Sequence, residues 1–510
     1  MIAFAVVGDA RRVCRHPLAL ALVAGLMLLE PQAAPAQADS SLIARRPIEA
    51  RLATQLGHHA SGALRERHRR NADRAATTVV VANCEDNGTG SLRDAAAGAV
   101  SGDVIDLSAL PCSTITLTSG GIIAAVDDIE LAGPGAGALT IDAAYHGRAF
   151  YHLGAGTIGL IGLTITHGTY SGGPYYRALG GCVFSTGDIY LSGSMVSGCT
   201  LVDAIADNTG AGGAGLLAYG SVTTFDSTVS ACEVTGSAGE TAVGAGIFAA
   251  ADIVLLRSTV SGNSADAGTG EAAGGGVLAL RDLTMKYSTI HGNSVTGYNA
   301  QGGGAYVQED VYVVASTISA NHAALGAGLK TGGSAATNVA QIRNSTISDN
   351  VAEIAGAGLV ATIPMRLSNS TVAFNTSIAL NVSGVYLGWD AELESSIIAN
   401  NSAGATVRDL GGDSDASITG ANNLIGVTFL TVPGDTISAD PLLGALADNG
   451  GQTRTHALLP GSPAIDAGNN LLDLARDQRG TGFARVIGAN ADIGAFEADP
   501  DRIFAGDFDG

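Results

Sequence analysis

Three aspartates recur at nearly equal intervals in this 510-residue chain and could carry chemistry: Asp252, Asp282 and Asp310. Asp188 stands in the same phase two repeats earlier. Carboxylates held close together repel, which raises a pKa or creates a calcium site. Two carboxylates at a defined separation serve glycoside hydrolysis, whereas a calcium-dependent lyase needs an acidic cluster beside a basic residue.

Arg281 and Lys286 flank Asp282 and would supply that basic residue. The candidate catalytic residues are therefore Asp252, Asp282, Asp310, Arg281 and Lys286, with calcium as a possible cofactor. The competing interpretation is a column of turn residues in which each Asp caps nearby backbone. We favour the turn column because the aspartates coincide with a recurrent turn. We see no spacing typical of a metal site.

These aspartates would be positioned by an internal repeat, S-T-[VI]-x-x-N. Its steps run from 25 to 33 residues. The copies begin at Ser194, Ser227, Ser258, Ser288, Ser316, Ser345 and Ser370, with looser ones at Leu163 and Ser396. A glycine cluster with a short apolar strand precedes each copy, and another short strand lies between them. No segment shows a sustained helical period.

Three short strands in each unit of this length fit one coil of a parallel β-helix, because leucine-rich repeats and propeller blades need other patterns. The predicted fold is all-β: a right-handed parallel β-helix of about ten three-strand coils, with an N-terminal cap and a C-terminal capping or anchor domain. Equivalent residues of successive coils would lie about 4.8 Å apart. The terminal asparagines should then form an amide ladder. Its predicted members are Asn263, Asn293, Asn321, Asn350, Asn375 and Asn401.

The cysteines receive a structural interpretation. Cys199 and Cys232 take the Asn position in adjacent coils, and a separation near one strand spacing lies within the Cα range of a disulfide. We predict a Cys199–Cys232 bond. Cys84 and Cys112 bracket the first strand region and are expected to pair across the N-terminal cap. The pairing of Cys182 stays open.

The chain ends suggest export. Arg11, Arg12 and Arg15 precede a short apolar run and a small-x-small site, which predicts a signal peptide over residues 1–38. Residues 39–76 form a basic segment with eight arginines, interpreted as a linker. We assign residues 77–114 to the N-terminal cap, 115–404 to the β-helix, 405–497 to the C-terminal region and 498–510 to a tail. No transmembrane segment is expected in the mature chain.

The net charge of the body limits the kinds of partner that it can bind. Residues 77–510 contain 15 basic and 41 acidic residues, a net charge of −26. Such a surface repels nucleic acid and anionic lipid, so neither is an expected partner of the body.

Both ends of the body carry a family resemblance. The stretches Thr89–Ala95, Gly102–Asp106 and Ile115–Leu117 resemble the start of bacterial exported β-helix proteins of the pectate-lyase-like superfamily. The segments Asp440–Leu443, Asn449–Thr453, His456–Pro460, Gly461–Gly468, Asp477–Gly480 and Asp492–Glu497 resemble the choice-of-anchor type Q domain of proteins similar to polymorphic outer-membrane proteins. The resemblance implies the fold and a secreted or cell-surface location in a bacterium. It implies no catalytic mechanism.

Two functions remain open. The favoured one is an adhesive, glycan-contacting or structural module without catalysis, whose partners would be cell-surface or extracellular glycans. The alternative is a secreted polysaccharide lyase or glycoside hydrolase that uses acidic residues on the β-helix face. The sequence does not indicate the oligomeric state.

Overall fold

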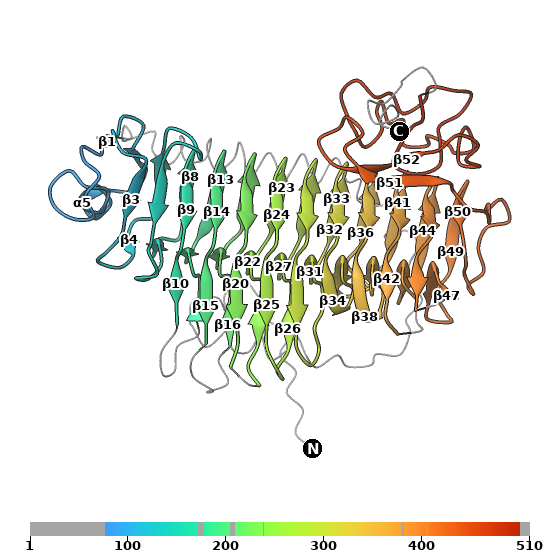
Figure 1. The fold of residues 1–510 in the computed structure, drawn as a ribbon, viewed down its shortest axis with the longest axis horizontal. Coiled ribbons are helices and arrows are strands. Elements are labelled where there is room, and N and C mark those ends of the chain that lie inside the picture. Colours follow the sequence, from blue (N-terminus) through green and yellow to red (C-terminus); the bar gives the residue numbers. More distant parts are fainter. Residues whose placement is uncertain are drawn as a thin grey trace, which may run out of the picture. The chain divides into compact units, whose positions relative to one another are not determined.

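The computed structural model describes residues 77–171, 178–203, 210–237, 239–379, 382–404 and 406–499. The chain divides into two units, Met1–Asp39 and Ser40–Gly510, and all described residues belong to the second. They form a parallel β-helix of about 11 turns with almost no helix (Figure 1). The all-β fold class predicted from the repeat is confirmed. The expected signal peptide, the basic segment 39–76 and residues 500–510 of the expected tail lie outside the described residues.

One coil illustrates the repeat. The glycine cluster leads into β22 (Ile247–Ala249), the middle strand is β23 (Ile253–Leu256), and the S-T-V motif forms β24 (Thr259–Ser261). A further strand, β25 (Ser264–Asp266), follows the Asn of the motif and was not predicted. Its alternating side chains are small, with only Ala265 buried, so its sequence carries little hydrophobic signal.

Equivalent strands of successive coils pair in parallel and build the sheets. Sheet A contains β1 (Thr78–Val80), β2 (Asp103–Asp106), β5 (Ile129–Ala132), β8 (Thr157–Ile161), β13 (Asp188–Ser192), β18 (Val222–Phe225), β23, β28 (Leu283–Lys286), β32 (Val311–Val314), β36 (Ala340–Arg343), β40 (Met365–Ser368), β44 (Ala391–Glu394) and β49 (Ile418–Ala421). Sheet B contains β3 (Thr114–Thr116), β6 (Thr140–Asp142), β9 (Thr164–Thr166), β14 (Met195–Ser197), β19 (Thr228–Ser230), β24, β29 (Thr289–His291), β33 (Thr317–Ser319), β37 (Thr346–Ser348), β41 (Thr371–Ala373), β45 (Ile397–Ala399) and β50 (Leu424–Ile425).

Sheet C contains β4 (Ile122–Ala124), β7 (Phe150–His152), β12 (Val183–Ser185), β17 (Leu216–Ala218), β22, β27 (Val277–Ala279), β31 (Ala305–Val307), β35 (Leu329–Thr331), β39 (Leu359–Ala361), β43 (Val385–Leu387) and β48 (Leu410–Gly412). Sheet D contains β10 (Thr169–Tyr170), β15 (Thr200–Val202), β20 (Glu233–Thr235), β25, β30 (Ser294–Thr296), β34 (His322–Leu325), β38 (Val351–Ala355), β42 (Thr376–Ser377), β46 (Ser402–Ala403) and β47 (Thr406–Val407). The small sheet E contains β11 (Ala178–Leu179), β16 (Ala211–Gly212), β21 (Ala242–Val243) and β26 (Ala272–Ala273).

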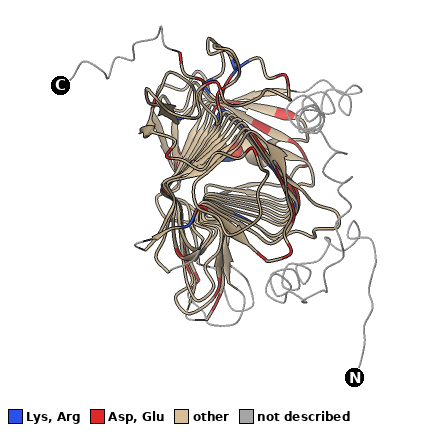
Figure 2. Cartoon of the chain, turned by 90° about the vertical axis from the view of Figure 1, so that its right-hand side faces the viewer, with Lys and Arg blue, Asp and Glu red and all other residues tan. Residues whose placement is uncertain are grey.

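The inward side chains of sheets A, B, C and D form one continuous apolar core. The inward positions of sheet B are Ile or Val in coil after coil, and they are almost completely buried. Viewed from its C-terminal end, the stack carries its charged residues mainly around its perimeter (Figure 2). Each coil aligns with the next because a shift of one residue would move every apolar side chain to the wrong face.

The motif begins and ends at sharp bends in the backbone. The residue before the Ser has a positive φ, as at Arg257 (44°), and so does the residue before the Asn, as at Ala320 (53°). At the first bend the Ser hydroxyl caps the preceding coil: the backbone N–H of Ser258 donates to Oγ of Ser288 at 3.1 Å. The S and N of the motif therefore mark the two bends that flank sheet B.

The predicted amide ladder is present. Nδ2 of each Asn donates to Oδ1 of the Asn in the next coil, from Asn263 through to Asn401, at 2.8–3.0 Å. The glycine cluster faces this ladder across the coil. A Cβ on Gly276 would lie 3.0 Å from the side chain of Asn293 and 2.5 Å from a backbone oxygen, so only glycine fits there.

The disulfides correct one prediction. Cys84 bonds Cys112 at the N-terminal cap, which is the expected pair. The predicted Cys199–Cys232 bond is wrong, because Cys199 bonds Cys182 and Cys232 is a buried free thiol. Stacked side chains point in the same direction, so the two sulfur atoms do not face each other. Sγ of Cys199 lies near the carbonyl of Ser197, and Sγ of Cys232 lies near that of Ser230. Cys182, in contrast, occupies the glycine position that faces the Asn column, and its Cα lies 5.6 Å from that of Cys199.

The N-terminal cap consists of α5 (Leu92–Gly98) and the loops around it. Ser91 caps the helix by accepting a hydrogen bond from the backbone N–H of Asp94, and Leu92 packs into the core. β1 and β2 of this segment already pair with sheet A. At the other end, coil strands continue to Ile425, past the boundary expected at residue 404, because Leu410 and Ile425 extend the core columns.

The C-terminal region folds back along the stack instead of simply closing its end. It contains the antiparallel hairpin β51 (Leu443–Ala447) and β52 (Thr455–Leu458), and it covers the outer face of sheet B over the last coils (Figure 1). Oγ1 of Thr346 donates to the side chain of Gln478, and Ser348 bonds His456. Outward residues of β33 and β37 are consequently buried, whereas their equivalents in β19 and β24 are half-exposed.

Candidate functional site

The aspartate column lies where the repeat places it, at the start of the sheet A strands. Asp252, Asp282 and Asp310 are all buried. Oδ1 of Asp252 accepts the backbone N–H of Asp282 at 3.3 Å, and Oδ1 of Asp282 accepts that of Asp310 at 3.0 Å. The Tyr312 hydroxyl donates to Oδ2 of Asp310. The two contacts with backbone N–H groups join neighbouring coils and favour the turn interpretation of the column.

The two basic candidates point to different neighbours. Nε of Arg281 lies 3.7 Å from carboxylate oxygens of both Asp252 and Glu309, and its side chain is half-exposed. Nζ of Lys286 lies 5.4 Å from the centre of the Tyr287 ring. Within the described ranges, no group of three or more His, Cys, Asp or Glu side chains is placed to hold a metal ion.

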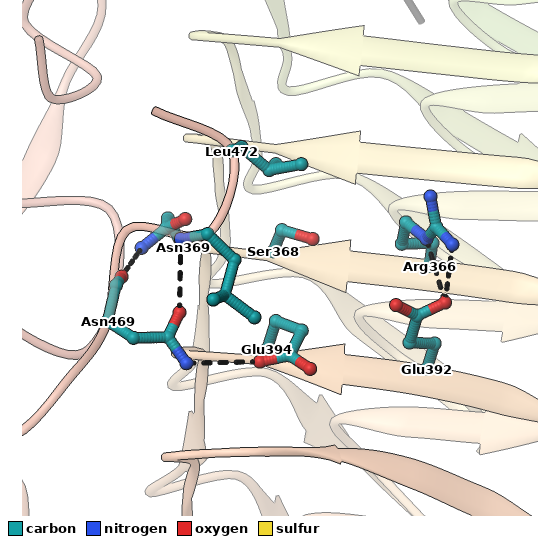
Figure 3. A pocket seen from close by; sticks show the side chains of 8 residues that line it. Arg366, Ser368, Asn369, Glu392, Glu394, Asn469 and Leu472 are labelled. Carbon is teal, nitrogen blue, oxygen red and sulfur yellow. Dashed lines mark hydrogen bonds and ion pairs between the residues drawn. The ribbon is translucent and has the colours of Figure 1, made fainter. Parts of the chain in front are cut away.

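A polar cleft lies elsewhere on sheet A, where the C-terminal region meets the outer face of two strands (Figure 3). Its floor comes from β40 and β44, and its wall comes from the loop at residues 469–472. Its free volume is about 50 Å³. The lining residues are Arg366, Ser368, Asn369, Glu392, Glu394, Asn469, Leu471 and Leu472.

Strand alternation and register build the cleft floor. Glu392 and Glu394 alternate with the buried Leu393 on β44, so both face outward. In the preceding coil Arg366 pairs in register with Glu392. Nε and Nη2 of Arg366 donate to Oε2 of Glu392 at 2.9 and 2.5 Å, so this carboxylate is compensated by a cation.

Glu394 has a different environment. Nδ2 of Asn469 donates to its Oε2 at 3.2 Å. Burial raises the pKa of Glu394 above its usual value, and the neighbouring carboxylates of Glu392 and Asp435 add to the increase, although the Asn469 hydrogen bond opposes it. The cleft thus holds one charge-paired carboxylate and one carboxylate whose ionised form is disfavoured.

Asn469 holds the cleft wall in place. Its backbone N–H donates to Oγ of Ser395, its carbonyl accepts from Nδ2 of Asn369, and its Nδ2 also donates to Asn422. Beyond it, Leu471 is 71% exposed and Leu472 is 37% exposed, which gives the cleft an apolar lip. The wall and the floor are about 75 to 100 residues apart in the chain.

Sequence reasoning missed this cleft. The one available signal was that Arg366 and Glu392 stand one repeat step apart, which predicts an ion pair across two coils. Tyrosines of the coils, whose rings could stack on sugars, do not line the cleft: Tyr306 and Tyr312 are buried, Tyr298 is exposed elsewhere, and Tyr175 and Tyr176 lie outside the described residues.

Comparison with known proteins yields one finding. No protein-family model matches the sequence, and no curated protein matches it. A solved structure, described as "Crystal structure of pectate lyase Pel9A", is similar to this chain with a TM-score of 0.41 and 14% sequence identity, over 83% of this chain and 97% of that one. The likeness concerns the fold alone. No helix in the described part of the chain is long and apolar enough to cross a membrane.

Proposed function

We propose that this chain is an exported β-helical protein that contacts glycans outside the cell or at its surface, without cleaving them. The cleft on sheet A carries the proposal. It combines hydroxyl, amide, carboxylate and guanidinium groups with two exposed leucines. Sugars offer many hydroxyl groups and apolar C–H faces, so this combination suits them. Because the cleft is small, it would bind one part of a longer glycan chain.

Two features support the extracellular part of the proposal. The described residues contain two disulfides, and disulfides persist in oxidising compartments. The resemblance of residues 440–497 to a choice-of-anchor domain supports a surface location. Cell fractionation with N-terminal sequencing of the mature protein tests this: we expect it outside the cytoplasm, starting at Asp39. A cytoplasmic protein that retains its first 38 residues would contradict export.

Glycan contact is tested on an array of neutral, acidic and amino glycans. Leu471→Asn should weaken binding, because it removes an apolar side chain from the lip without adding charge or disturbing a buried contact. Tyr298→Asn is the matched control, since Tyr298 is 82% exposed and lies outside the cleft. If the native protein retains no glycan, or if both variants bind like it, the cleft is not a glycan site.

Hydrolysis is the second candidate, favoured by the two carboxyl groups on β44. The Cα atoms of residues two apart on a strand are about 6.6 Å apart and their side chains point to the same face, which can accommodate the roughly 6.5–9.5 Å found between the carboxyl groups of inverting glycosidases. Glu394 would act as the acid and Glu392 as the base. Release of reducing ends that Glu394→Gln abolishes would establish this activity. Release of unsaturated ends that Asp282→Ala abolishes would instead establish the lyase alternative.

A further inference from the structure

We propose that the sheet A cleft selects glycans that carry a free amino group, such as deacetylated hexosamine polymers, and not uronic acids. This inference rests on the proposed glycan contact and names its ligand class.

Two carboxyl groups and one guanidinium group line the cleft. The guanidinium of Arg366 directs two of its N–H groups to Glu392. Within the part of the chain that the structure describes, Glu394 forms no ion pair, and the side chain that bonds its carboxylate is the neutral amide of Asn469. The cleft therefore presents one carboxylate without a cation, beside an ion pair.

An anionic sugar would meet this carboxylate at close range and would have to compete with Glu392 for Arg366. The net charge of −26 on residues 77–510 adds long-range repulsion. A protonated amine, in contrast, would donate charge-assisted hydrogen bonds to Glu394, and such bonds are stronger than neutral ones. Burial and the charge of Glu392 disfavour the ionised form of Glu394, and a bound cation would stabilise that form against both.

The remaining groups favour a sugar over a simple cation. Ser368 and Asn369 are buried in the floor, and the half-buried Arg366, Glu392 and Asn469 offer the hydrogen-bonding groups beside Glu394. Leu471 and Leu472 form the exposed apolar lip, which would pack against the C–H face of a ring. A polyamine or a lysine-rich peptide would use the carboxylate but would gain little from the leucines.

The test measures binding of the full mature protein to a glucosamine hexamer, its N-acetylated counterpart, a galacturonate oligomer and spermine, at mildly acidic pH and low salt. We expect the glucosamine hexamer to bind most tightly. Glu394→Gln should weaken that binding about tenfold, the loss expected for a partly desolvated charge contact, and should leave binding of the N-acetylated hexamer unchanged. Glu130→Gln is the matched control, because Glu130 faces outward on the same sheet at its other end.

The outcomes separate the two proposals. Equal binding of the amino and N-acetylated hexamers, unaffected by Glu394→Gln, would overturn the amine preference and leave glycan contact standing. Preferred binding of the galacturonate oligomer or spermine would also overturn it. No binding of any sugar would remove both proposals. Thermal melting of Glu394→Gln shows that a loss of binding does not arise from unfolding.

Discussion

Oδ1 of Asp409 accepts hydrogen bonds from both the backbone N–H and the side-chain Nδ2 of Asn401, at 2.7 and 3.0 Å. Asp409 thus ends the asparagine ladder with an acceptor where the next Asn would stand. Its Oδ2 accepts the backbone N–H of Val427 at 2.7 Å. Burial raises the pKa of Asp409, although these hydrogen bonds oppose the increase.

Replacing Asp409 should therefore destabilise the last coils. Asp409→Ala leaves the buried backbone N–H of Asn401 without an acceptor and removes one acceptor each from Nδ2 of Asn401 and the backbone N–H of Val427. We expect a loss of about 2–4 kcal/mol in the free energy of unfolding. Asp409→Asn should cost less, because its oxygen can still accept from Asn401. Urea denaturation measures both. Asp415→Ala, an exposed change in the same coil, is the control; equal losses for Asp409→Ala and Asp415→Ala would show that the ladder end contributes nothing.

The contact between the glycine column and the ladder gives a second prediction. Gly276→Ala would place Cβ 2.5 Å from the carbonyl oxygen of Gly304, so the coils must shift, at a cost of about 1–3 kcal/mol. Gly434→Ala meets nothing within 4 Å and has no positive φ, so it should be neutral or slightly stabilising. The melting temperature of Gly276→Ala should fall, whereas that of Gly434→Ala should stay the same or rise slightly. Parallel shifts would refute the close contact.

The cysteine pairing predicts the outcome of peptide mapping. Digestion without reduction should yield Cys84 linked to Cys112 and Cys182 linked to Cys199. Cys232 should react with an alkylating reagent only after unfolding, because burial raises its pKa to about 12 and the thiolate is the reactive form. Alkylation of Cys232 in the native protein, or a peptide that links it to Cys199, would contradict the structure.

Cys232 also offers a test of the ladder itself. Its backbone N–H already donates to Oδ1 of Asn263 at 3.0 Å. Cys232→Asn would add one amide rung in the same position, opposite Gly215. We expect this variant to raise the melting temperature by about 1 °C, as one net hydrogen bond would in a chain of this size. Cys232→Leu is the control, since it fills the site without an amide.

Docking of the C-terminal region should depend on pH through His456. Nδ1 of His456 bonds the carbonyl of Gly444, and Nε2 bonds Oγ of Ser348, so the neutral ring satisfies both contacts. Burial lowers the pKa of His456. A depressed pKa means that docking keeps its full stability above the unfolded pKa of about 6.5 and loses it as the pH falls below that value.

Limited proteolysis across this pH range measures the effect. Cleavage within residues 440–497 should increase as the pH falls, and His456→Gln should weaken this pH dependence because glutamine does not titrate. His322→Gln, at a half-exposed histidine on sheet D, should leave the pH dependence unchanged. Cleavage that does not change with pH in the native protein would show that His456 does not control docking.

The repeat was sufficient to predict which residues of neighbouring coils stack on each other. The spacing of the S-T-[VI]-x-x-N copies sets which residues stack, so the β-helix, the Asn ladder and the inward Val and Ile columns follow from it. The same spacing explains why the aspartates form a column. It did not reveal that their carboxylates accept backbone N–H groups of the next coil, because that depends on side-chain direction at the bend.

The sequence by itself therefore determined the fold and its stacked columns, because parallel strands one spacing apart repeat the same local geometry. Only the tertiary structure decided which residues face each other across a coil, and this is why Cys182, not Cys232, bonds Cys199. It also decided where residues 440–497 dock, since that depends on contacts made over more than 100 residues. The cleft needs both relationships: strand register brings Arg366 to Glu392, and the fold-back brings Asn469 to Glu394.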